Sequence, residues 1–386
     1  MFRRIYMDAN ATTPLLPEVF EAMRPYFIER FGNASSVHSF GQRARGAVEQ
    51  ARLHLAEFIH CRPAEVVFTS GGTESDNLAL FGSTRSGDHV ITTAIEHHAV
   101  LHAAEALQRM GREVTFLGVD ANGVVDLDEL RRALRPNTRL ISVMMANNET
   151  GAIQPVEAIG AIAAESGVLF HTDAVQSAGK LPIDVEKIGC HLLSISGHKM
   201  HAPQGTGVLF VRKDIKLEPL FYGGSHERQR RAGTENLAGI VALGKAAEIA
   251  AAGIRDGVPA KIATLRDHLE QSIVAAVGEA GAHATAAPRV PNTTNLWFDH
   301  VEGEALVISL DLKGLAVSGG SACASGASEP SHVLTAMHVP ADRARASLRF
   351  SLSKLSTPED VDAAIALVPE AVGKLRELSP HYAAVN

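Results

Sequence analysis

Leu193-Ser194-Ile195-Ser196-Gly197-His198-Lys199 is an apolar run that passes into small and polar residues and ends in a lysine. Such a run predicts a buried strand that delivers its last residue to the edge of a sheet. Lysine is costly to bury, and its amine becomes a useful nucleophile when it is desolvated or lies near other cations. Lys199 is therefore a candidate for forming an imine with a carbonyl group, and a solvated lysine at a strand end is the alternative.

Short apolar strands, each followed by a polar or glycine-bearing loop, recur through the first part of the chain. The predicted strands are residues 65–69, 89–93, 113–117, 140–145, 168–171, 192–195 and 207–211. The predicted helices are residues 17–31 and 40–60, two helices that end near 81 and 110, and residues 126–133 and 156–166. Strands that alternate with such helices indicate an α/β fold with a mostly parallel sheet that is covered on both faces.

The last third of the chain has a different pattern. An alanine-rich helical stretch runs from about Lys245 to Glu279, and the closing helix starts at Pro358. Between them we expect strands at 294–298 and 346–351, a helix at 302–312 and a Gly/Ser/Ala loop at 318–328. This order predicts a smaller α+β domain.

Composition excludes several classes of protein. The chain has 386 residues, of which 46% are hydrophobic and 20% charged, as in an ordinary globular protein. Its net charge of -7 comes without acidic or basic blocks, which argues against a nucleic-acid or anionic-membrane partner. Residues 1–14 contain no apolar run long enough for a signal peptide, and we expect no later stretch to approach the roughly eighteen apolar residues of a bilayer span.

The three cysteines are far apart and form no CxxC pair. A disulfide framework and a cysteine-rich metal cage are therefore not expected, and a reducing, cytoplasmic location fits best. Cys61 and Cys190 lie beside apolar residues and are expected to be structural. Cys323 stands in a run of small residues that can do little to bury it, which suggests a functional thiol on an exposed, glycine-bearing loop.

Polar residues follow several of the predicted strands. In a parallel sheet, ligands bind beyond the carboxyl ends of the strands. We therefore expect one site to gather Gly72, Thr73, His97, Asn148, Asp173, His198 and Lys199. The backbone N–H groups at Gly71-Gly72-Thr73 suit a phosphate group, whereas a capping box formed by Thr73 and Asp76 is the alternative.

Asp173 and Arg349 have specific chemical uses. A carboxylate at a strand end can pair with the protonated ring nitrogen of a cofactor. The alternative is an iron site in which His171, Asp173 and a distant histidine are the ligands. Arg349 projects from a strand and is suited to grip a carboxylate, and the loop 230–235 has the composition of a second phosphate clamp.

Together these motifs resemble the signatures of cysteine desulfurases in the class V aminotransferase group. The matching stretches are Gly71–Asn77, Ala146–Gly151, His171–Gln176, Ser196–Lys199, Arg231–Asn236 and Gly320–Cys323. They follow the family's order and span nearly the whole chain. Within this NifS/IscS-like family, Ala146–Gly151, His198–Pro203 and the ending Leu378–Pro380 are most similar to the nitrogenase-associated NifS branch.

The resemblance implies the fold of fold-type I pyridoxal phosphate enzymes. That fold has a large α/β domain with a mostly parallel seven-stranded sheet, here expected at residues 13–248. A smaller α+β domain would be formed by residues 1–12 and 249–386. It would carry a mobile cysteine loop at about 318–330. Ala324 stands where many relatives have Thr or Ser, which leaves the fine positioning of this loop open.

The resemblance also implies roles for residues. Lys199 would hold pyridoxal 5'-phosphate as an imine, and Asp173 would pair with the ring nitrogen. His97 would stack on the ring and take part in catalysis, and Gln176 would bond the phenolic oxygen. The other implied cofactor and substrate contacts are Gly72, Thr73, Ser196 and His198 for the phosphate, Thr234 of a partner subunit in a homodimer, and Asn148 and Arg349 for the substrate carboxylate.

The implied reaction removes sulfur from L-cysteine, giving L-alanine and a persulfide on Cys323. An iron–sulfur scaffold protein would accept the sulfur, with nitrogenase maturation favoured over general cluster assembly. No resident metal is implied, although Cys323 would transiently share a cluster with the scaffold.

Other functions stay open from the sequence. A selenocysteine lyase or a cysteine-sulfinate desulfinase would need less from Cys323, and a plain aminotransferase would give its loop no task. A non-catalytic sulfur-carrier subunit would leave Lys199 unexplained.

Overall fold

The larger sheet of the protein has seven strands. The computed structural model describes residues 4–319 and 330–378. The sheet order is β2-β8-β7-β6-β5-β3-β4. Its strands are β2 (Val66–Thr69), β3 (His89–Thr93), β4 (Glu113–Leu117), β5 (Thr138–Ser142), β6 (Leu169–Asp173), β7 (Leu192–Ser196) and β8 (Gly207–Val211). Only β8 runs antiparallel to its neighbours, so the predicted mostly parallel seven-stranded sheet is confirmed.

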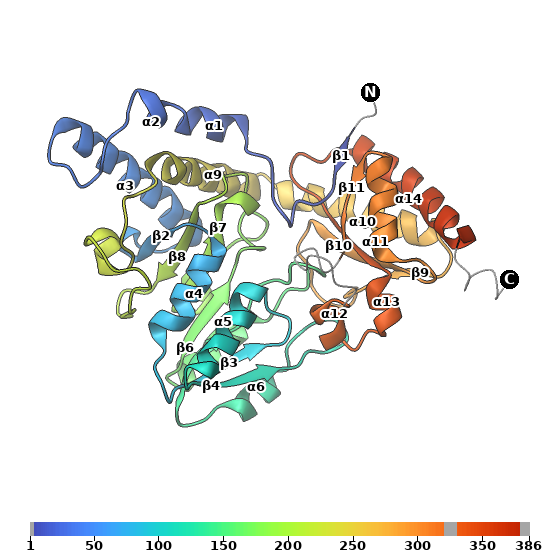
Figure 1. Cartoon of the computed structure of the whole chain (residues 1–386), viewed down its shortest axis with the longest axis horizontal. Helices are drawn as coiled ribbons and strands as arrows, with labels where there is room; N and C mark the ends of the chain where they lie inside the picture. Colours follow the sequence, from blue (N-terminus) through green and yellow to red (C-terminus); the bar gives the residue numbers. More distant parts are fainter. Residues whose placement is uncertain (1–3, 320–329, 379–386) are drawn as a thin grey trace.

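Helices cover both faces of this sheet (Figure 1). Alternate residues of the inner strands point to opposite faces and enter two hydrophobic clusters. Val90, Leu140 and Leu192 pack with residues of α4 (Gly72–Ser83) and α5 (His98–Arg109). Their neighbours Ile91, Ile141 and Leu193 pack with residues of α3 (Ser39–Ile59), α7 (Val156–Glu165) and α9 (Leu237–Arg255). The continuous apolar runs in the sequence follow from this burial on both sides.

Two predicted helices are broken. Residues 17–31 form α1 (Pro17–Met23) and α2 (Pro25–Ile28), because Pro25 starts a new helix and cannot continue the old one. The predicted alanine-rich helix starts earlier, as α9, and a separate α10 (Val258–Ala276) follows it. Gly257 lies between them with a φ of +74°, a left-handed conformation that ends the helical path.

Helix α9 is more apolar than expected, because no stretch of the chain was expected to be long and apolar enough to span a bilayer. By length and composition alone, α9 could cross a bilayer, with a mean hydropathy of 1.6 over a window that is 50% buried inside the protein. Its buried face packs closely on α3, where a Cβ on Gly244 would lie 2.6 Å from the Ala51 Cα atom. This packing gives α9 the position of a core helix that covers the large sheet.

A second, antiparallel sheet has the order β12-β13-β10-β9, with strands β9 (Ala280–Ala282), β10 (Thr293–Phe298), β12 (Ser318–Gly319) and β13 (Ser347–Ser351). Its hydrophobic cluster includes side chains of α10, α11 (Gly303–Leu312) and α14 (Pro358–Leu378). The predicted smaller α+β unit is therefore present. The strands β9 and β12 and the short helices α12 (His332–Ala336) and α13 (Ala341–Arg345) were not predicted. The division of the chain at residues 12/13 and 248/249 stays a prediction.

The amino-terminal segment joins the two sheets. β1 (Ile5–Tyr6) pairs with β11 (Leu315–Ala316), and Asp8 then forms a bridge with Ser351 of β13. At the other end of the segment, the N–H and hydroxyl groups of Thr13 both donate to the carbonyl oxygen of His198, at 2.9 and 2.8 Å. Residues 8–13 therefore cross from the small sheet to the end of β7, beside Lys199.

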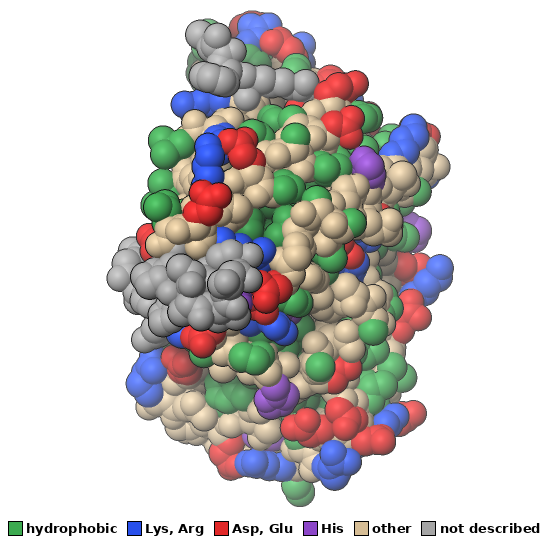
Figure 2. Space-filling model, turned by 90° about the vertical axis from the view of Figure 1, so that its right-hand side faces the viewer, with side chains coloured by type: hydrophobic (Ala, Val, Ile, Leu, Met, Phe, Trp, Pro, Cys, Tyr) green, Lys and Arg blue, Asp and Glu red, His purple; other side chains and the backbone are tan. Residues whose placement is uncertain are grey.

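The surface carries both signs of charge. On the face seen in Figure 2, acidic and basic side chains are interspersed among hydrophobic and uncharged ones. This mixture of charges agrees with the sequence, which contains no acidic or basic blocks.

The buried ion pair between Arg52 of α3 and Glu227 gives a testable effect on stability. Both side chains are 4% exposed, and they form two hydrogen bonds of 2.8 and 2.9 Å. Replacing Arg52 by methionine leaves the Glu227 carboxylate buried without its cation. We expect the free energy of unfolding to fall by about 3–5 kcal/mol.

Denaturant unfolding measures this change, and Arg24→Met is the matched control. Arg24 pairs with Glu21 on the surface, where the side chains are 53% and 63% exposed. Its loss is expected to cost less than about 1 kcal/mol. Equal losses of stability in the two variants would contradict the role of the buried pair.

Candidate active site

A cavity of about 640 Å³ lies where β6 and β7 end and where α4 and α5 begin. The predicted site residues that line it are Gly72, Thr73, His97, Asn148, Asp173, Gln176, Ser196, His198, Lys199 and Arg349. Thr234 does not line it and is exposed on the loop before α9. Cys323 lies outside the described residues. The clustering agrees with the rule that ligands bind beyond the carboxyl ends of parallel strands.

The amino end of α4 forms one wall of the cavity. Gly71 is the N-cap residue and no side chain caps the helix, so the capping box of Thr73 and Asp76 is wrong. A Cβ on Gly72 would come within 2.9 Å of Val175 Cγ2, which means that a larger residue would crowd this corner. Backbone N–H groups without a side-chain cap attract an anion such as a phosphate group.

Asp173 is the last residue of β6 and is buried at the cavity wall. Its Oδ1 atom accepts a hydrogen bond of 2.8 Å from the Val175 N–H group. Burial raises the pKa of Asp173 to about 6, and the Val175 N–H group and the Lys199 cation limit this rise. A second cation at Asp173 would further favour the carboxylate, so the position suits a protonated ring nitrogen.

Asp76 and Glu96 are two buried carboxyl groups near Asp173, and their burial was not predicted from the sequence. Burial, reinforced by the Asp173 charge, raises the pKa of Asp76 well above its ordinary value. Burial also raises the pKa of Glu96 to about 8, although its Oε1 atom accepts hydrogen bonds from Met144 N and Thr93 Oγ1. Among these three groups, Asp173 is therefore the one that most readily carries the negative charge.

His171 does not support the alternative of an iron site. The residue is fully buried, and its ring nitrogens lie 2.8 Å from Ser142 Oγ and 3.0 Å from Ser194 Oγ. Burial lowers the pKa of His171 to about 3, so the ring is neutral. Within residues 4–319 and 330–378, no group of three or more His, Cys, Asp and Glu side chains is placed to hold a metal ion.

His97 and His198 line the cavity as neutral imidazoles. Burial, with a contribution from the Lys199 cation, lowers the pKa of each to about 4. His97 is the N-cap of α5, and its Nδ1 atom accepts a hydrogen bond of 3.1 Å from the Ala99 N–H group, so its proton lies on Nε2. His198 Nδ1 lies 3.0 Å from Thr12 Oγ1. A neutral imidazole can stack on a ring or move a proton.

Lys199 lies in the turn Gly197–Lys199 directly after β7, which confirms its predicted position at a strand end. Its Nζ atom donates to the backbone oxygens of Asn10 and Ala11, at 2.5 and 2.7 Å. The amine is held at the cavity by these carbonyl groups, and the alternative of a solvated lysine is not supported.

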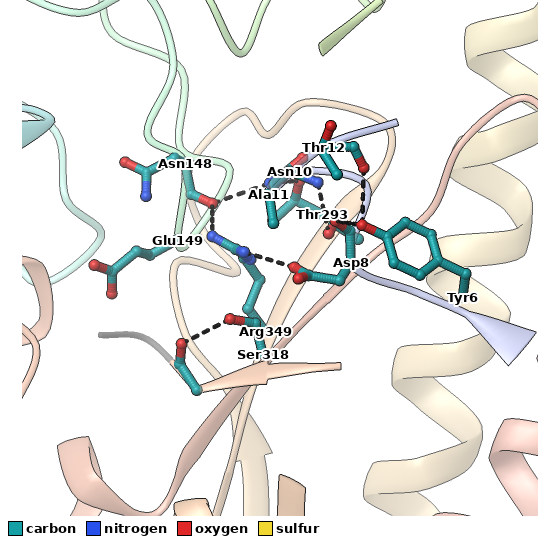
Figure 3. A network of polar contacts seen from close by, with 12 residues as sticks. Tyr6, Asp8, Asn10, Ala11, Thr12, Asn148, Glu149, Thr293, Ser318 and Arg349 are labelled. Carbon is teal, nitrogen blue, oxygen red and sulfur yellow. Dashed lines mark hydrogen bonds and ion pairs between the residues drawn. The ribbon is translucent and has the colours of Figure 1, made fainter. Parts of the chain in front are cut away.

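Arg349 of β13 is buried, and the amino-terminal segment forms an ion pair with it through Asp8 (Figure 3). Its Nη2 atom donates to Asp8 Oδ1 at 2.7 Å, and its Nη1 atom donates to the Asn148 backbone oxygen at 3.1 Å. The Nε atom is buried and has no hydrogen-bond partner among the described residues. Arg349 lines the cavity, and its guanidinium suits a carboxylate. Asp8, which orients the guanidinium, was not predicted from the sequence.

Glu149 links the cavity to the residue that opens α12. The Ser331 hydroxyl donates to Glu149 Oε2 at 2.5 Å and accepts from the Leu334 N–H group as the helix N-cap. Burial raises the pKa of Glu149 to about 7, opposed by Ser331 and by the Arg349 cation. Glu149 lay inside a recognised motif, but nothing local in the sequence pointed to Ser331.

The donors around the cavity fit pyridoxal 5'-phosphate. The start of α4, Ser196 and His198 offer anion contacts, Asp173 offers a buried carboxylate, and Lys199 offers an amine. These groups meet at one cavity of about 640 Å³.

Comparisons with known proteins agree with this site. The family model described as "Aminotransferase class-V" matches residues 5–364. The chain is 45% identical to a protein named cysteine desulfurase IscS from Dictyoglomus turgidum, over 99% of this chain and 98% of the relative. It is 48% identical to a protein of the same name from Methanosarcina thermophila, over 98% of this chain and 94% of the relative.

A solved structure described as a NifS-like protein has a TM-score of 0.89 and 36% identity, and the match covers 96% of this chain and all of the other. The fold, the lysine-centred cavity and these full-length matches agree, and the chain belongs to the class V aminotransferase family, in its cysteine desulfurase group.

Proposed function

We propose that the protein is a cysteine desulfurase in which Lys199 holds pyridoxal 5'-phosphate and Cys323 receives the sulfur. The observation that carries the proposal is one cavity in which the Lys199 amine, the Asp173 carboxylate, the start of α4 and Arg349 meet. When bound there, pyridoxal phosphate would act as an electron sink for the substrate carbon.

The protein's residues hold and orient the reactants. The backbone N–H groups at Gly72 and Thr73, with Ser196 and His198, bind the phosphate. Asp173 would keep the ring nitrogen protonated, the neutral imidazole of His97 would contact the ring, and Gln176 would donate to the phenolic oxygen. Arg349, oriented by Asp8 and the Asn148 carbonyl, binds the substrate carboxylate together with the Asn148 side chain.

Proton movement and sulfur transfer use two different side chains. The Lys199 amine would move a proton at the substrate Cα atom. The Cys323 thiolate attacks the substrate sulfur, and an S–S bond forms as the C–S bond breaks. The C–S electron pair stays with the three-carbon product, which takes up protons and leaves as L-alanine, while the sulfur remains as a persulfide.

A homodimer would place Thr234 at the partner's phosphate site. Thr234 is exposed on a loop that Arg231 ties to Glu74 at 2.9 Å. Large apolar side chains are also exposed on the described surface, among them Phe27 at 62%, Ile28 at 78%, Val37 at 87% and Tyr222 at 83%. Such exposure supports an interface with a second copy.

The sulfur acceptor proposed here is an iron–sulfur scaffold protein in the cytoplasm, where reducing conditions would keep Cys323 a thiol. A nitrogenase-specific scaffold is the narrower hypothesis, and it rests on the motif wording alone.

The function is tested by product analysis with L-cysteine, cysteine sulfinate and selenocysteine, each with and without a keto acid. With L-cysteine and a reductant, purified protein is expected to form alanine and sulfide in equal amounts without any keto acid. Alanine from cysteine sulfinate or selenocysteine at a much higher kcat/KM would favour a desulfinase or a selenocysteine lyase. Amino exchange that requires a keto acid would indicate an aminotransferase, and a colourless protein that forms no imine would support a carrier subunit.

A further inference from the structure

Lys180 is a second buried lysine near Lys199, and none of the roles given above uses it. It is 9% exposed, in the turn that follows β6, and lies four residues after Gln176. Its Nζ atom donates to Gln176 Oε1 at 2.8 Å and to Asn10 Oδ1 at 3.1 Å. Both acceptors are neutral amide oxygens, so these two contacts of the Lys180 amine are hydrogen bonds and not ion pairs.

Asn10 connects Lys180 to Lys199. Its side-chain oxygen accepts from Lys180, and its backbone oxygen accepts from Lys199 Nζ and from Gln176 Nε2, at 2.5 and 3.1 Å. Its side-chain nitrogen donates to the Asn148 backbone oxygen at 3.0 Å, which also contacts Arg349. Asn10 is 2% exposed, and its side-chain oxygen also accepts from Asn292 Nδ2 at 3.0 Å, so Lys180 and Asn292 hold this oxygen together.

Lys180 also decides which end of the Gln176 amide faces it. The Gln176 Oε1 atom accepts from Lys180, and the Gln176 Nε2 atom donates to the Asn10 backbone oxygen, so the NH₂ group points away from Lys180. Gln176 lines the main cavity, whereas Lys180 does not. The Gln176 NH₂ group is therefore the end of the amide that can donate toward the cavity and to the Asn10 backbone oxygen.

The surroundings of Lys180 are apolar on one side and cationic on the other. A small second cavity of about 60 Å³, lined by both Lys180 and Lys199, is bordered by Ile249, Ala250 and Leu352. Burial, with the charges of Lys199 and Arg349, lowers the pKa of Lys180 well below its ordinary value.

We propose that Lys180 is a positioning residue that fixes the amide of Gln176 and, through Asn10, the backbone oxygen that holds Lys199. The inference rests on the proposed function, in which Gln176 donates to the phenolic oxygen of the cofactor. Donation to that oxygen favours its ionised form, which makes the nearby linkage between Lys199 and the cofactor easier to deprotonate.

The test is a pH titration of the visible absorption of the bound cofactor, in the holoenzyme without substrate. Other titratable and charged groups around the two lysines are Asp173, His97, His198, His201, Arg349 and Lys354, and every variant keeps them. Lys180→Met is expected to raise the pH midpoint by about one unit, because the donor to the phenolic oxygen is no longer held. Lys187→Met is the matched control, since Lys187 is 76% exposed, and it should leave the midpoint unchanged.

A double-mutant cycle tests whether Lys180 acts through Gln176. Gln176→Leu is also expected to raise the midpoint, and the double variant should resemble Gln176→Leu alone. Fully additive shifts, or a Lys180→Met midpoint equal to that of the unchanged protein, would overturn the proposal. If Lys180→Met does not fold, Lys180→Gln keeps one donor and should give a smaller shift in the same direction, and no shift would again overturn it.

The same titration separates this inference from the proposed function. A holoenzyme without a visible band would argue against the proposed function itself. A normal band in the unchanged protein, combined with no effect of Lys180, would refute the positioning role alone.

Discussion

Replacing Lys199 by alanine is expected to abolish the visible absorption that arises from its bond to the cofactor. Activity is expected to fall by about 10²–10⁴-fold or more, the range typical for the loss of a positioned proton-transfer group. The reason is that, in the proposed function, the amine held by Asn10 and Ala11 both anchors the cofactor and moves the proton at Cα. Lys199→Arg should lose the band as well, because a guanidinium keeps its charge but cannot form the bond.

Reduction with borohydride followed by peptide mapping measures the attachment site directly. The cofactor mass is expected on the peptide that contains Lys199. Lys187→Ala serves as the control, because Lys187 is 76% exposed, and it should keep both band and activity. Cofactor mass on the peptide with Lys180, the other buried amine, would contradict the assignment.

Replacing Cys323 by alanine is expected to leave the visible band intact and to remove sulfur transfer. We expect persulfide formation and sulfide release to fall by about 10³-fold or more, as for the loss of an enzyme nucleophile. The two variants would therefore distinguish the proposed roles, in which Lys199 is needed for the cofactor bond and Cys323 for the sulfur transfer. Persulfide labelling with mass spectrometry, together with the absorption spectrum, measures both properties on one sample.

Cys61→Ala and Cys190→Ala are the controls for Cys323. Burial raises the pKa of both thiols to about 12, so neither carries much thiolate near neutral pH. A thiol without thiolate character is a poor nucleophile. If sulfide release survived in Cys323→Ala and disappeared in Cys61→Ala, Cys61 would be the sulfur acceptor. That result would contradict the role proposed for Cys323.

Local patterns predicted the large sheet well. Strands β3, β4 and β8 have the predicted bounds, and the continuous apolar run of β8 follows from burial along its whole length. Helix limits were harder where one residue interrupts a continuing pattern. Pro25 and Gly257 break helices that periodicity alone would extend, and the two-residue strands β1, β11 and β12 are too short to leave a pattern.

The candidate site was predicted where residues follow strands, and missed where they come from the amino-terminal segment. Asp173, His198 and Lys199 each stand at the end of an apolar run, so one topological rule places them together. Asp8 and Asn10 stand in a segment without periodicity. Their contacts with Arg349 and Lys199 join positions that are 341 and 189 residues apart in the sequence.

The sequence alone identified Lys199 as a candidate for imine formation. The reason is that an apolar run ending in Ser-Gly-His-Lys places its last residue at the end of a strand. The order of motifs likewise determined the family and the cofactor. Tertiary structure decided how the amine is held, through Asn10, and which groups set its surroundings, through Lys180 and Gln176. The physical reason is that hydrogen bonds and buried charges depend on distances between segments, whereas apolar periodicity records only which side of each element is buried.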